Sequence, residues 1–300
     1  MQEKTELLKI YGQATELLPP RIRRAANALS DEDKIKVNEI HLRAGRPLSV
    51  SICGKEKVID NHTSVLFEEI SLFLDIVTHG SVHTVQSSIN RGYITAPGGH
   101  RIGLCGSGAK LSSGEVTMRD ISSVCIRVAR EIKGFAKDVF LQVVRSQGVL
   151  SSIIISPPGH GKTTMLRDLV RCVSDAGYRV SLVDERGELA AKRKGVSQFD
   201  VGMCTDVLDG TEKAYGSLLM LRTMSPEVIA LDEITETADT EAISKIANCG
   251  VGIIATIHGE SAEEVFSKPI YRGLQMQKIF KKAIVLKKEK GIFTYKVSDV

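Results

Sequence analysis

The apolar positions of the second half of the chain predict strands and helices in alternation. From about residue 134 onward, short apolar runs rich in β-branched residues recur between longer stretches of helical periodicity. Such runs are typical of strands buried on both faces, and their alternation with helices indicates parallel βαβ units. The expected strands are residues 150–155, 180–183, 228–231, 251–257 and 282–286.

The first half has a different pattern, in which helices precede strands of alternating polarity. Residues 1 to about 37 have helical spacing with a break at Pro19-Pro20, and residues 68–79 predict another helix. We therefore expect a smaller α+β domain at residues 1–133 and an α/β domain with a mainly parallel sheet at residues 134–300. The expected strands of the first domain are residues 38–43, 48–52, 58–60, 92–95, 101–106 and 124–128.

A loop that can bind phosphate follows the first expected strand of the second domain. Its glycines, lysine and threonine stand between an apolar run and a helix-like stretch, the context that a phosphate-binding loop requires. In such a loop, backbone N–H groups and the helix N-terminus surround phosphate oxygens. The residues expected to bind nucleotide are Ser156, Pro157, Pro158, Gly159, His160, Gly161, Lys162, Thr163 and Thr164.

Two side chains of this loop have expected roles of their own. Lys162 would reach the β- and γ-phosphates, and Thr163 would offer its hydroxyl to Mg²⁺. Ser156 departs from the usual pattern, which has glycine at this position because glycine tolerates a positive φ. The alternative interpretation is a plain strand–turn–helix with a chance Gly-Lys-Thr sequence.

Two carboxylates follow the expected strand 228–231, at the end of the strands where open α/β sheets bind their ligands. Asp232 is expected to hold the hydration shell of Mg²⁺, and Glu233 to orient or deprotonate an attacking water. A strand that merely ends in two solvated acids is the alternative. The presence of Lys162 in the same chain favours the functional interpretation.

Polar residues also end two further expected strands. Asp184, Glu185 and Glu188 follow strand 180–183 and could bind Mg²⁺ or position water, so Glu185 is the alternative to Glu233 as the catalytic acid. His258 ends strand 251–257 and could sense the γ-phosphate through a hydrogen bond, although a lone histidine is usually structural.

Three arginines of the first domain are candidates for completing the site from another domain or subunit. An arginine finger supplied in this way neutralises charge in the transition state of phosphoryl transfer. Isolated arginines are more often plain surface residues, which is the alternative for each of them. The candidates are Arg101, Arg127 and Arg130.

Composition argues against several other classes of protein. The 300 residues are 42% hydrophobic, and no run of about 18 or more apolar residues predicts a membrane span. The charged N-terminus is unlike a signal peptide. The six cysteines are scattered without zinc spacing and mostly in apolar surroundings, which favours reduced core thiols in a cytosolic protein. A net charge of +4 and the absence of Trp argue against threading of nucleic acid.

In their order along the chain, these motifs resemble those of the secretion-type ATPases. These are hexameric RecA-like motors, of the wider RecA/AAA+ class, that drive type II and type IV secretion and pilus retraction. The resembling segments are residues 161–163, 183–185, 221–227, 232–233 and 255–258. More closely, nearly the whole chain is similar to the stage III sporulation protein AA family. The segments that carry this likeness are residues 39–47, 92–95, 98–103, 184–186, 205–210 and 224–228.

The resemblance implies a RecA-like P-loop ATPase domain behind an N-terminal domain, with ATP and Mg²⁺ as cofactors. It implies a homohexamer with nucleotide at the subunit boundaries. It also implies a motor on the mother-cell side of the forespore, cytoplasmic and peripheral to the membrane, that serves a secretion-like channel of membrane proteins. No stable nucleic-acid partner is expected.

Two alternative functions stay open. The segment Ile234-Thr235-Glu236 stands where the family usually has Ile-Gly-Arg, and Ser156 stands where glycine is usual. Both departures motivate a nucleotide-binding assembly scaffold with little turnover. A nucleic-acid-stimulated ATPase is the third possibility, because many RecA-like rings thread nucleic acid.

Overall fold

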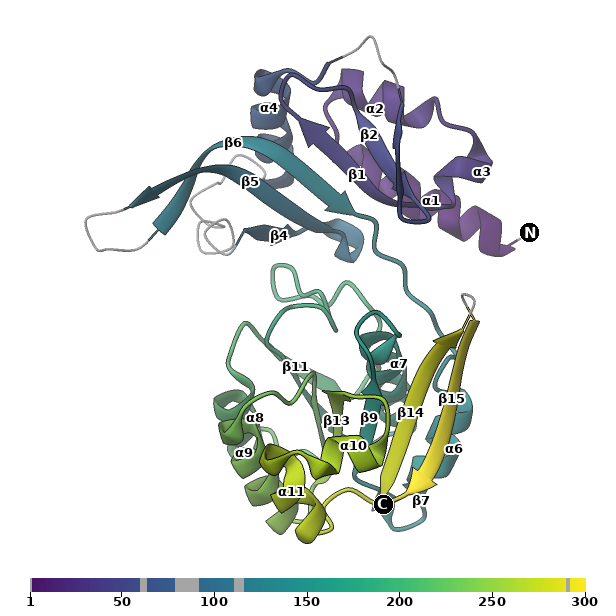
Figure 1. Cartoon of the computed structure of the whole chain (residues 1–300), viewed down its shortest axis with the longest axis vertical. Helices are drawn as coiled ribbons and strands as arrows, with labels where there is room; N and C mark the ends of the chain where they lie inside the picture. Colours follow the sequence, from purple (N-terminus) through teal and green to yellow (C-terminus); the bar gives the residue numbers. More distant parts are fainter. Residues whose placement is uncertain (1, 60–63, 79–91, 111–115, 290–291) are drawn as a thin grey trace. The chain divides into compact units, whose positions relative to one another are not determined.

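The chain forms two compact units, Met1–Arg130 and Glu131–Val300 (Figure 1). The first unit contains one cluster of buried apolar side chains and the second contains two. The computed structural model describes residues 2–59, 64–78, 92–110, 116–289 and 292–300. Each unit has a sheet covered by helices and its own hydrophobic core, so each is described by itself.

The second unit is built on a seven-stranded sheet in the order β11-β10-β12-β13-β9-β14-β15. All neighbouring strands are parallel except β14 and β15, which form an antiparallel pair at one edge, drawn in yellow in Figure 1. The strands are β9 (Ser152–Ser156), β10 (Val180–Asp184), β11 (Thr205–Asp209), β12 (Val228–Leu231), β13 (Gly252–His258), β14 (Lys282–Glu289) and β15 (Ile292–Asp299).

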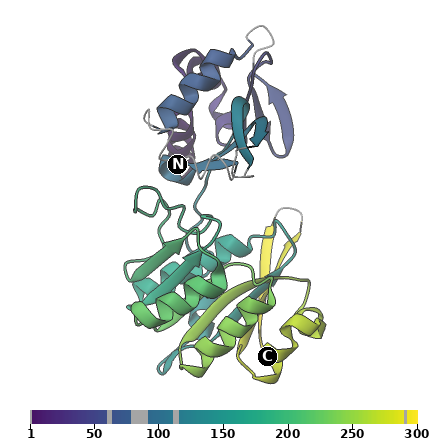
Figure 2. The same cartoon turned by 90° about the vertical axis from the view of Figure 1, so that its left-hand side faces the viewer.

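Helices cover both faces of this sheet, which explains why its central strands are mainly apolar (Figure 2). Successive residues of β9 point to opposite faces: Ile154 packs with α6 (Lys137–Val143) and α7 (Lys162–Asp175). Ile153 and Ile155 belong to the core of the other face. That face is covered by α8 (Lys213–Thr223), α9 (Thr237–Asn248), α10 (Ala262–Ser267) and α11 (Pro269–Met276).

The first unit has a six-stranded antiparallel sheet in the order β3-β2-β1-β6-β5-β4. Its core lies on one face, where apolar residues of the strands pack against α1, α2 and α4. The helices are α1 (Gln2–Glu16), α2 (Pro20–Asn27), α3 (Asp31–Lys34) and α4 (Phe67–Thr78), with a 3-10 turn η2 (Pro97–Gly99). The strands are β1 (Val37–Arg43), β2 (Ser49–Ile52), β3 (Lys55–Val58), β4 (Tyr93–Thr95), β5 (Arg101–Lys110) and β6 (Val116–Arg127).

The α/β fold with a mainly parallel sheet is the one that the sequence predicts, but several elements differ from expectation. The strands β11 and β15 were not predicted, and neither was the short hairpin of β7 (Val144–Arg145) and β8 (Gly148–Val149). Both β11 and β15 are edge strands with polar, partly exposed residues, so they lack the apolar run of a central strand. The strand expected at 124–128 is the end of the longer β6. The helix expected at 68–79 ends at Thr78, and His79 lies outside the described residues. The prediction of core thiols is wrong, since four of the six cysteines are exposed and the other two are only partly buried.

Among the residues that the structure describes, no helix is both long and apolar enough to cross a membrane.

Candidate nucleotide-binding site

The loop between β9 and α7 has the backbone of a phosphate-binding loop. Gly159 and Gly161 have φ values of 74° and 87°, in the left-handed region that glycine adopts without strain. A Cβ at Gly161 would also lie 3.2 Å from the ring of Phe293. Ser156 instead ends β9 with ordinary strand backbone, so a serine at this position fits without strain.

Lys162 lies at the centre of the site, with only 7% of the residue exposed. Its Nζ donates to the carbonyl oxygens of Ser156 and Pro157 at 3.1 and 3.3 Å and to Nδ1 of His258 at 2.7 Å. Burial lowers the pKa of Lys162, and the nearby Glu233 and Asp232 carboxylates oppose that shift. A lysine ammonium at this place in such a loop is a point charge that can bind phosphate oxygens in exchange for these contacts.

Asp232 and Thr163 bring an acid and a hydroxyl together from different elements. Oδ2 of Asp232, directly after β12, lies 3.4 Å from Oγ1 of Thr163, in the first turn of α7. The other carboxylate oxygen accepts from Oγ1 of Thr256 at 2.8 Å. Burial raises the pKa of Asp232, the Thr256 hydrogen bond lowers it, and neighbouring carboxylates raise it further. Carboxylate and hydroxyl oxygens are ligands that Mg²⁺ prefers, and a cation here would relieve the cost of the buried charge.

Glu233 has a strained backbone, and its carboxylate contacts the side chains of His258 and Arg186. Its φ is 48°, unusual for a residue other than glycine, and its N–H donates to the Thr256 hydroxyl at 2.8 Å. Its carboxylate contacts Nε2 of His258 and accepts from Nη1 of Arg186 at 3.1 Å. Strain of this kind is often found at functional sites. His258 therefore stands between Lys162 and Glu233 and contacts both.

The acidic residues after β10 have different surroundings. Asp184 is 1% exposed and accepts backbone N–H groups of Glu188, Leu189 and Ala190 at 2.8 to 3.1 Å. Burial raises the pKa of Asp184, and these backbone hydrogen bonds oppose the rise. Its oxygens are thus engaged in shaping the loop, whereas Glu185 forms an ion pair with Lys213 of α8.

Several residues of the site carried no sequence signal of their own. Arg167 is buried; it donates to the carbonyls of Leu189 and Glu188 at 2.7 and 2.6 Å and stacks on the Phe199 ring. The contacts of Arg186 and Thr256 likewise join segments far apart in the sequence. A single-chain pattern does not reveal such contacts, although Thr256 stands two residues before His258 at the end of a predicted strand.

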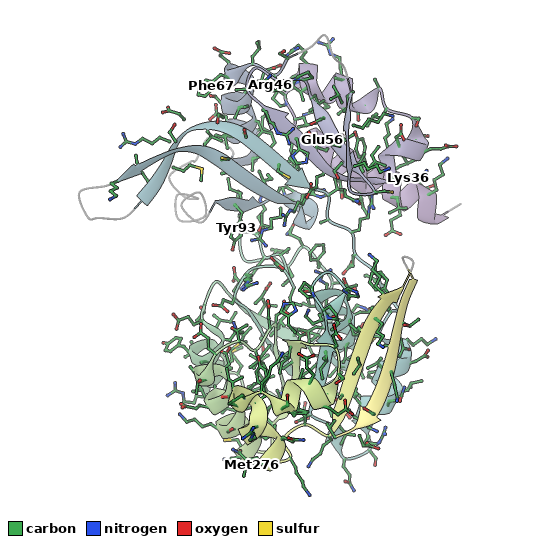
Figure 3. The ribbon with its side chains drawn as sticks, in the orientation of Figure 1. Lys36, Arg46, Glu56, Phe67, Tyr93 and Met276 are labelled. Carbon is green, nitrogen blue, oxygen red and sulfur yellow. The ribbon has the colours of Figure 1, made fainter. Side chains whose placement is uncertain are left out.

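The three candidate arginines lie on the first unit, and each has a partner within that unit. The Arg101 guanidinium lies 4.0 Å from the ring centre of Tyr93, which Figure 3 labels. Nε of Arg127 lies 3.4 Å from a Glu39 oxygen. Arg130 is the most engaged, since it donates to two backbone carbonyls of the same unit, those of residues 35 and 37, at 2.7 Å each.

A cavity of about 800 Å³ opens beside the phosphate-binding loop. Its walls include the loop itself, the end of β13 and the end of β14, and they carry several basic side chains together with two acidic ones, Glu260 and Glu264, of which Glu264 pairs with Lys268. Basic groups beside a phosphate-binding loop suit an anionic ligand of nucleotide size. The lining residues include Pro157, Pro158, His160, His258, Lys268, Lys287 and Lys288.

A family model described as "Sporulation stage III, protein AA" matches residues 9–296. This chain belongs to the sporulation stage III protein AA family. It is 32% identical over 285 residues to stage III sporulation protein AA of Bacillus subtilis (strain 168), covering 93% of this chain and 92% of that protein. The resemblance to this family that the sequence motifs indicate is therefore confirmed.

Solved structures of ATPases share the fold of this chain. The pilus retraction motor PilT with bound ADP superposes with a TM-score of 0.62 at 16% identity, covering 93% of this chain and 82% of that chain. The ATPase DotB of Yersinia pseudotuberculosis gives 0.61 at 13% identity, covering 94% and 80%. The ATPase DotB of Legionella pneumophila gives 0.57 at 15% identity, covering 87% and 76%. These likenesses confirm the RecA-like α/β fold behind an N-terminal domain.

Proposed function

We propose that this protein is an Mg²⁺-dependent ATPase that acts as the motor of a secretion-like channel during sporulation. The observation that carries the proposal is the position of the Lys162 ammonium, buried in the loop and adjoining the residues at the ends of β12 and β13. Membership of the sporulation family supports the biological setting, and the fold shared with PilT and DotB supports an ATPase.

The phosphate-binding role falls to the loop and the start of α7. The backbone of residues 157–163 and the helix N-terminus would surround the phosphates, with Lys162 at the β- and γ-phosphate oxygens. Thr163 and Asp232 would hold Mg²⁺, which supplies charge neutralisation at the phosphate oxygens. The 3.4 Å separation of their oxygens supports this assignment.

Glu233 is the proposed general base, which accepts a proton from the attacking water. Its carboxylate contacts His258, and His258 in turn contacts Lys162. Glu233 therefore lies near the place where the terminal phosphate would bind. Glu185 is the less favoured candidate, because its carboxylate is paired with Lys213. His258 would report the γ-phosphate to Glu233, since it contacts both Lys162 and Glu233.

The motor is proposed to be a homohexamer with nucleotide at the subunit boundaries, completed by an N-terminal arginine. The secretion-ATPase fold supports a ring, and the membership of the sporulation family supports a place beside membrane proteins at the mother-cell side of the forespore. No stable nucleic-acid partner is proposed, because the net charge of +4 is small and Trp is absent.

A nucleotide-binding scaffold with little turnover is the second candidate. It is favoured by one observation: Glu233 is held by both Arg186 and His258, while Lys162 is held by His258 and loop carbonyls. The Glu233 carboxylate would have to leave these contacts before it could accept a proton from water. Ser156 no longer supports this candidate, since it fits its position without strain.

Steady-state phosphate release with ATP and Mg²⁺ separates the two candidates. The motor predicts turnover that Glu233→Gln reduces by a factor of about 100 or more, with ATP affinity nearly unchanged. Glu185→Gln is the matched control and should retain most activity. If Glu185→Gln is the inactive variant, the base is misassigned; if the wild-type protein binds ATP without releasing phosphate, the scaffold is favoured.

The binding step needs its own test. Lys162→Ala should weaken ATP binding by a factor of about 100 or more, because it removes a buried charge that contacts phosphate. Unchanged affinity in this variant, measured by calorimetry, would remove the basis of both candidates.

A further inference from the structure

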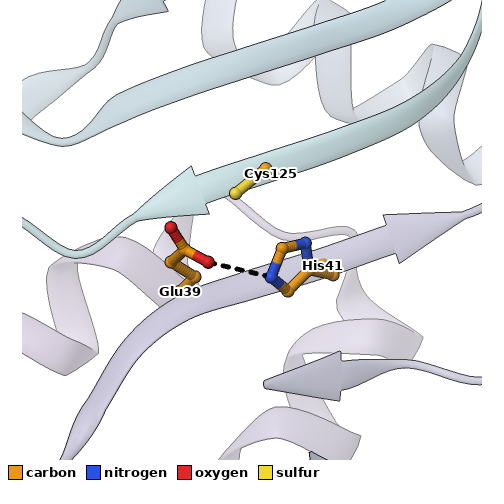
Figure 4. A group of neighbouring side chains, drawn as sticks. All are labelled: Glu39, His41 and Cys125. Carbon is orange, nitrogen blue, oxygen red and sulfur yellow. Dashed lines mark hydrogen bonds and ion pairs between the residues drawn. The ribbon is translucent and has the colours of Figure 1, made fainter. Parts of the chain in front are cut away.

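The polar face of the N-terminal sheet brings three potential metal ligands together. Glu39 and His41 are two residues apart on β1, so both point away from the core, which contains Ile40. Cys125 of β6 stands directly opposite His41 in the antiparallel register. One ligand atom from each side chain lies within 4.8 Å of the others (Figure 4).

We propose that Glu39, His41 and Cys125 form a binding site for a divalent transition-metal ion, with Zn²⁺ as the ion that the ligand set suits best. Thiolate, imidazole and carboxylate are the three ligand types that proteins use for Zn²⁺. Bonds of about 2.0 to 2.3 Å place tetrahedral ligand atoms about 3.3 to 3.8 Å apart. The three ligand atoms lie within 4.8 Å of one another on paired strands, so they would have to move closer together to bind one ion.

The contacts between these side chains identify the ligating atoms. Oε2 of Glu39 and Nε2 of His41 contact each other directly at 3.2 Å, and an ion bound by both atoms would replace this contact. The other oxygen of Glu39 is 3.4 Å from Nε of Arg127, which would keep the carboxylate oriented while Oε2 binds the ion. Arg127 is therefore a positioning residue of the proposed site.

The site has room for a fourth ligand. On the side away from β1, Cys125 pairs with Gly103 of β5, which offers no side chain to cover the thiol. Three protein ligands with an open position describe a site that binds water or a further group. In the free protein, burial and the Glu39 carboxylate raise the pKa of the Cys125 thiol, and Arg127 and Arg43 lower it. Binding of the ion would displace the thiol proton.

Sequence spacing could not reveal this cluster, because two ligands come from β1 and the third from β6 on the neighbouring strand. The site lies wholly within the first unit, whereas the phosphate-binding loop belongs to the second. The inference is thus independent of the proposed ATPase function.

Titration of the metal-free, full-length protein with Co²⁺ tests the site, because a cobalt–thiolate bond gives a charge-transfer band in the near ultraviolet. One equivalent of Co²⁺ should produce the band, and Zn²⁺ should displace it. Cys125→Ser should abolish the band, and His41→Gln and Glu39→Gln should each weaken Co²⁺ and Zn²⁺ affinity by about 10-fold or more. Cys105→Ser, an exposed cysteine on β5, is the matched control and should keep both the band and the affinity.

Three results would overturn the proposal. These are a wild-type protein without the band, a band that survives Cys125→Ser, and a band that is lost with Cys105→Ser. Circular dichroism shows whether each variant is folded. If Cys125→Ser does not fold, the partly exposed His41→Gln decides, and unchanged Zn²⁺ affinity in that variant counts against the site. Lys162→Ala should bind Zn²⁺ like the wild type, which separates this site from the nucleotide site.

Discussion

At the scale of single residues, the contact chain from Lys162 through His258 to Glu233 is the most informative feature of the nucleotide site. Because the lysine ammonium only donates, Nδ1 of His258 must accept, and Nε2 carries the proton directed at Glu233. Phosphate oxygens that attract the ammonium would loosen its contact with His258. His258 would then change its contact with Glu233, so the proposal predicts that nucleotide binding and the position of the base are coupled.

Replacement of His258 by alanine tests this coupling. We expect His258→Ala to reduce ATP turnover by a factor of about 10 to 100, because Glu233 loses a contact that orients it. ATP affinity should stay within a factor of about 3, since Lys162 keeps its loop contacts. Turnover is measured as phosphate release and affinity by calorimetry. Lys245→Ala, at an exposed position of α9, is the control, and equal activity of both variants would argue against the coupling.

His100 of the first unit predicts a dependence of stability on pH. It is fully buried; Nδ1 accepts from the Ala129 N–H at 3.1 Å, and Nε2 has no hydrogen-bond partner among the described residues. Burial lowers its pKa from 6.5 to about 4. Between these values the unfolded chain binds a proton that the folded chain does not. The free energy of unfolding should therefore fall as the pH falls from 7 towards 4, by about 3 kcal/mol in full.

Urea unfolding of the wild type and of His100→Gln at pH 7 and pH 5 measures this contribution. The wild type should lose about 2 kcal/mol more than the variant over this interval, because glutamine does not titrate. The imidazole signal of His100 in NMR should also remain that of the neutral ring at pH 5. A ring that titrates near 6.5 would contradict the assignment.

At the scale of elements, the sequence predicts those strands, helices and loops whose formation depends on residues that are neighbours in the chain. The central strands and the phosphate-binding loop follow from apolar runs and from the glycine, lysine and threonine between them. The edge strands β11 and β15 were missed, because their partly exposed faces carry polar residues. The positive φ of Glu233 and the pairing of His41 with Cys125 depend on contacts between distant segments, so a single sequence does not indicate them.

The loop between β9 and α7 predicts a specific sensitivity at Gly161. Gly161→Ala places a Cβ at a φ of 87° and 3.2 Å from the Phe293 ring, so the loop must shift or become strained by about 1 to 2 kcal/mol. We expect ATP affinity to fall by a factor of about 10 or more, measured by calorimetry.

The matched control is Gly273→Ala in α11. Apart from the nearby backbone of the helix itself, no described atom lies within 4 Å of a Cβ at this position, and alanine there should raise stability by about 0.5 to 1 kcal/mol. Its ATP affinity should equal that of the wild type. Wild-type affinity in Gly161→Ala as well would mean that the loop does not need the positive φ to bind nucleotide.

At the scale of the whole molecule, the proposed ring requires an arginine that would complete the nucleotide site across a subunit boundary. Arg101 and Arg127 stand opposite each other in the register of β5 and β6, and the Arg127 side chain is 66% exposed. Arg130 is bound to backbone carbonyls of its own unit. The largely exposed Arg127 is therefore the most available of the three to a neighbouring subunit, and loss of Arg130 should act mainly on stability.

Mixed rings test this assignment. Glu233→Gln subunits and Arg127→Ala subunits should each be nearly inactive alone, because each lacks one group at every interface. In a mixed ring, some interfaces combine an intact Arg127 from the first kind of subunit with an intact Glu233 from the second. Phosphate release should therefore return to a measurable fraction of the wild-type rate. The same experiment applies to Arg101→Ala.

The outcome depends on showing that mixed rings form, which native mass spectrometry with and without ATP establishes together with the number of subunits. Arg24→Ala, an exposed arginine on α2, is the control and should leave turnover unchanged in unmixed rings. In such a mixed ring no subunit carries both Arg127 and Glu233. Activity that is lost in Arg127→Ala and returns on mixing therefore requires that one subunit supplies the arginine to the site of its neighbour. Mixed rings that form and stay inactive for Arg101 and Arg127 would instead assign these arginines to the N-terminal sheet, where Arg127 holds Glu39 and Arg101 holds Tyr93.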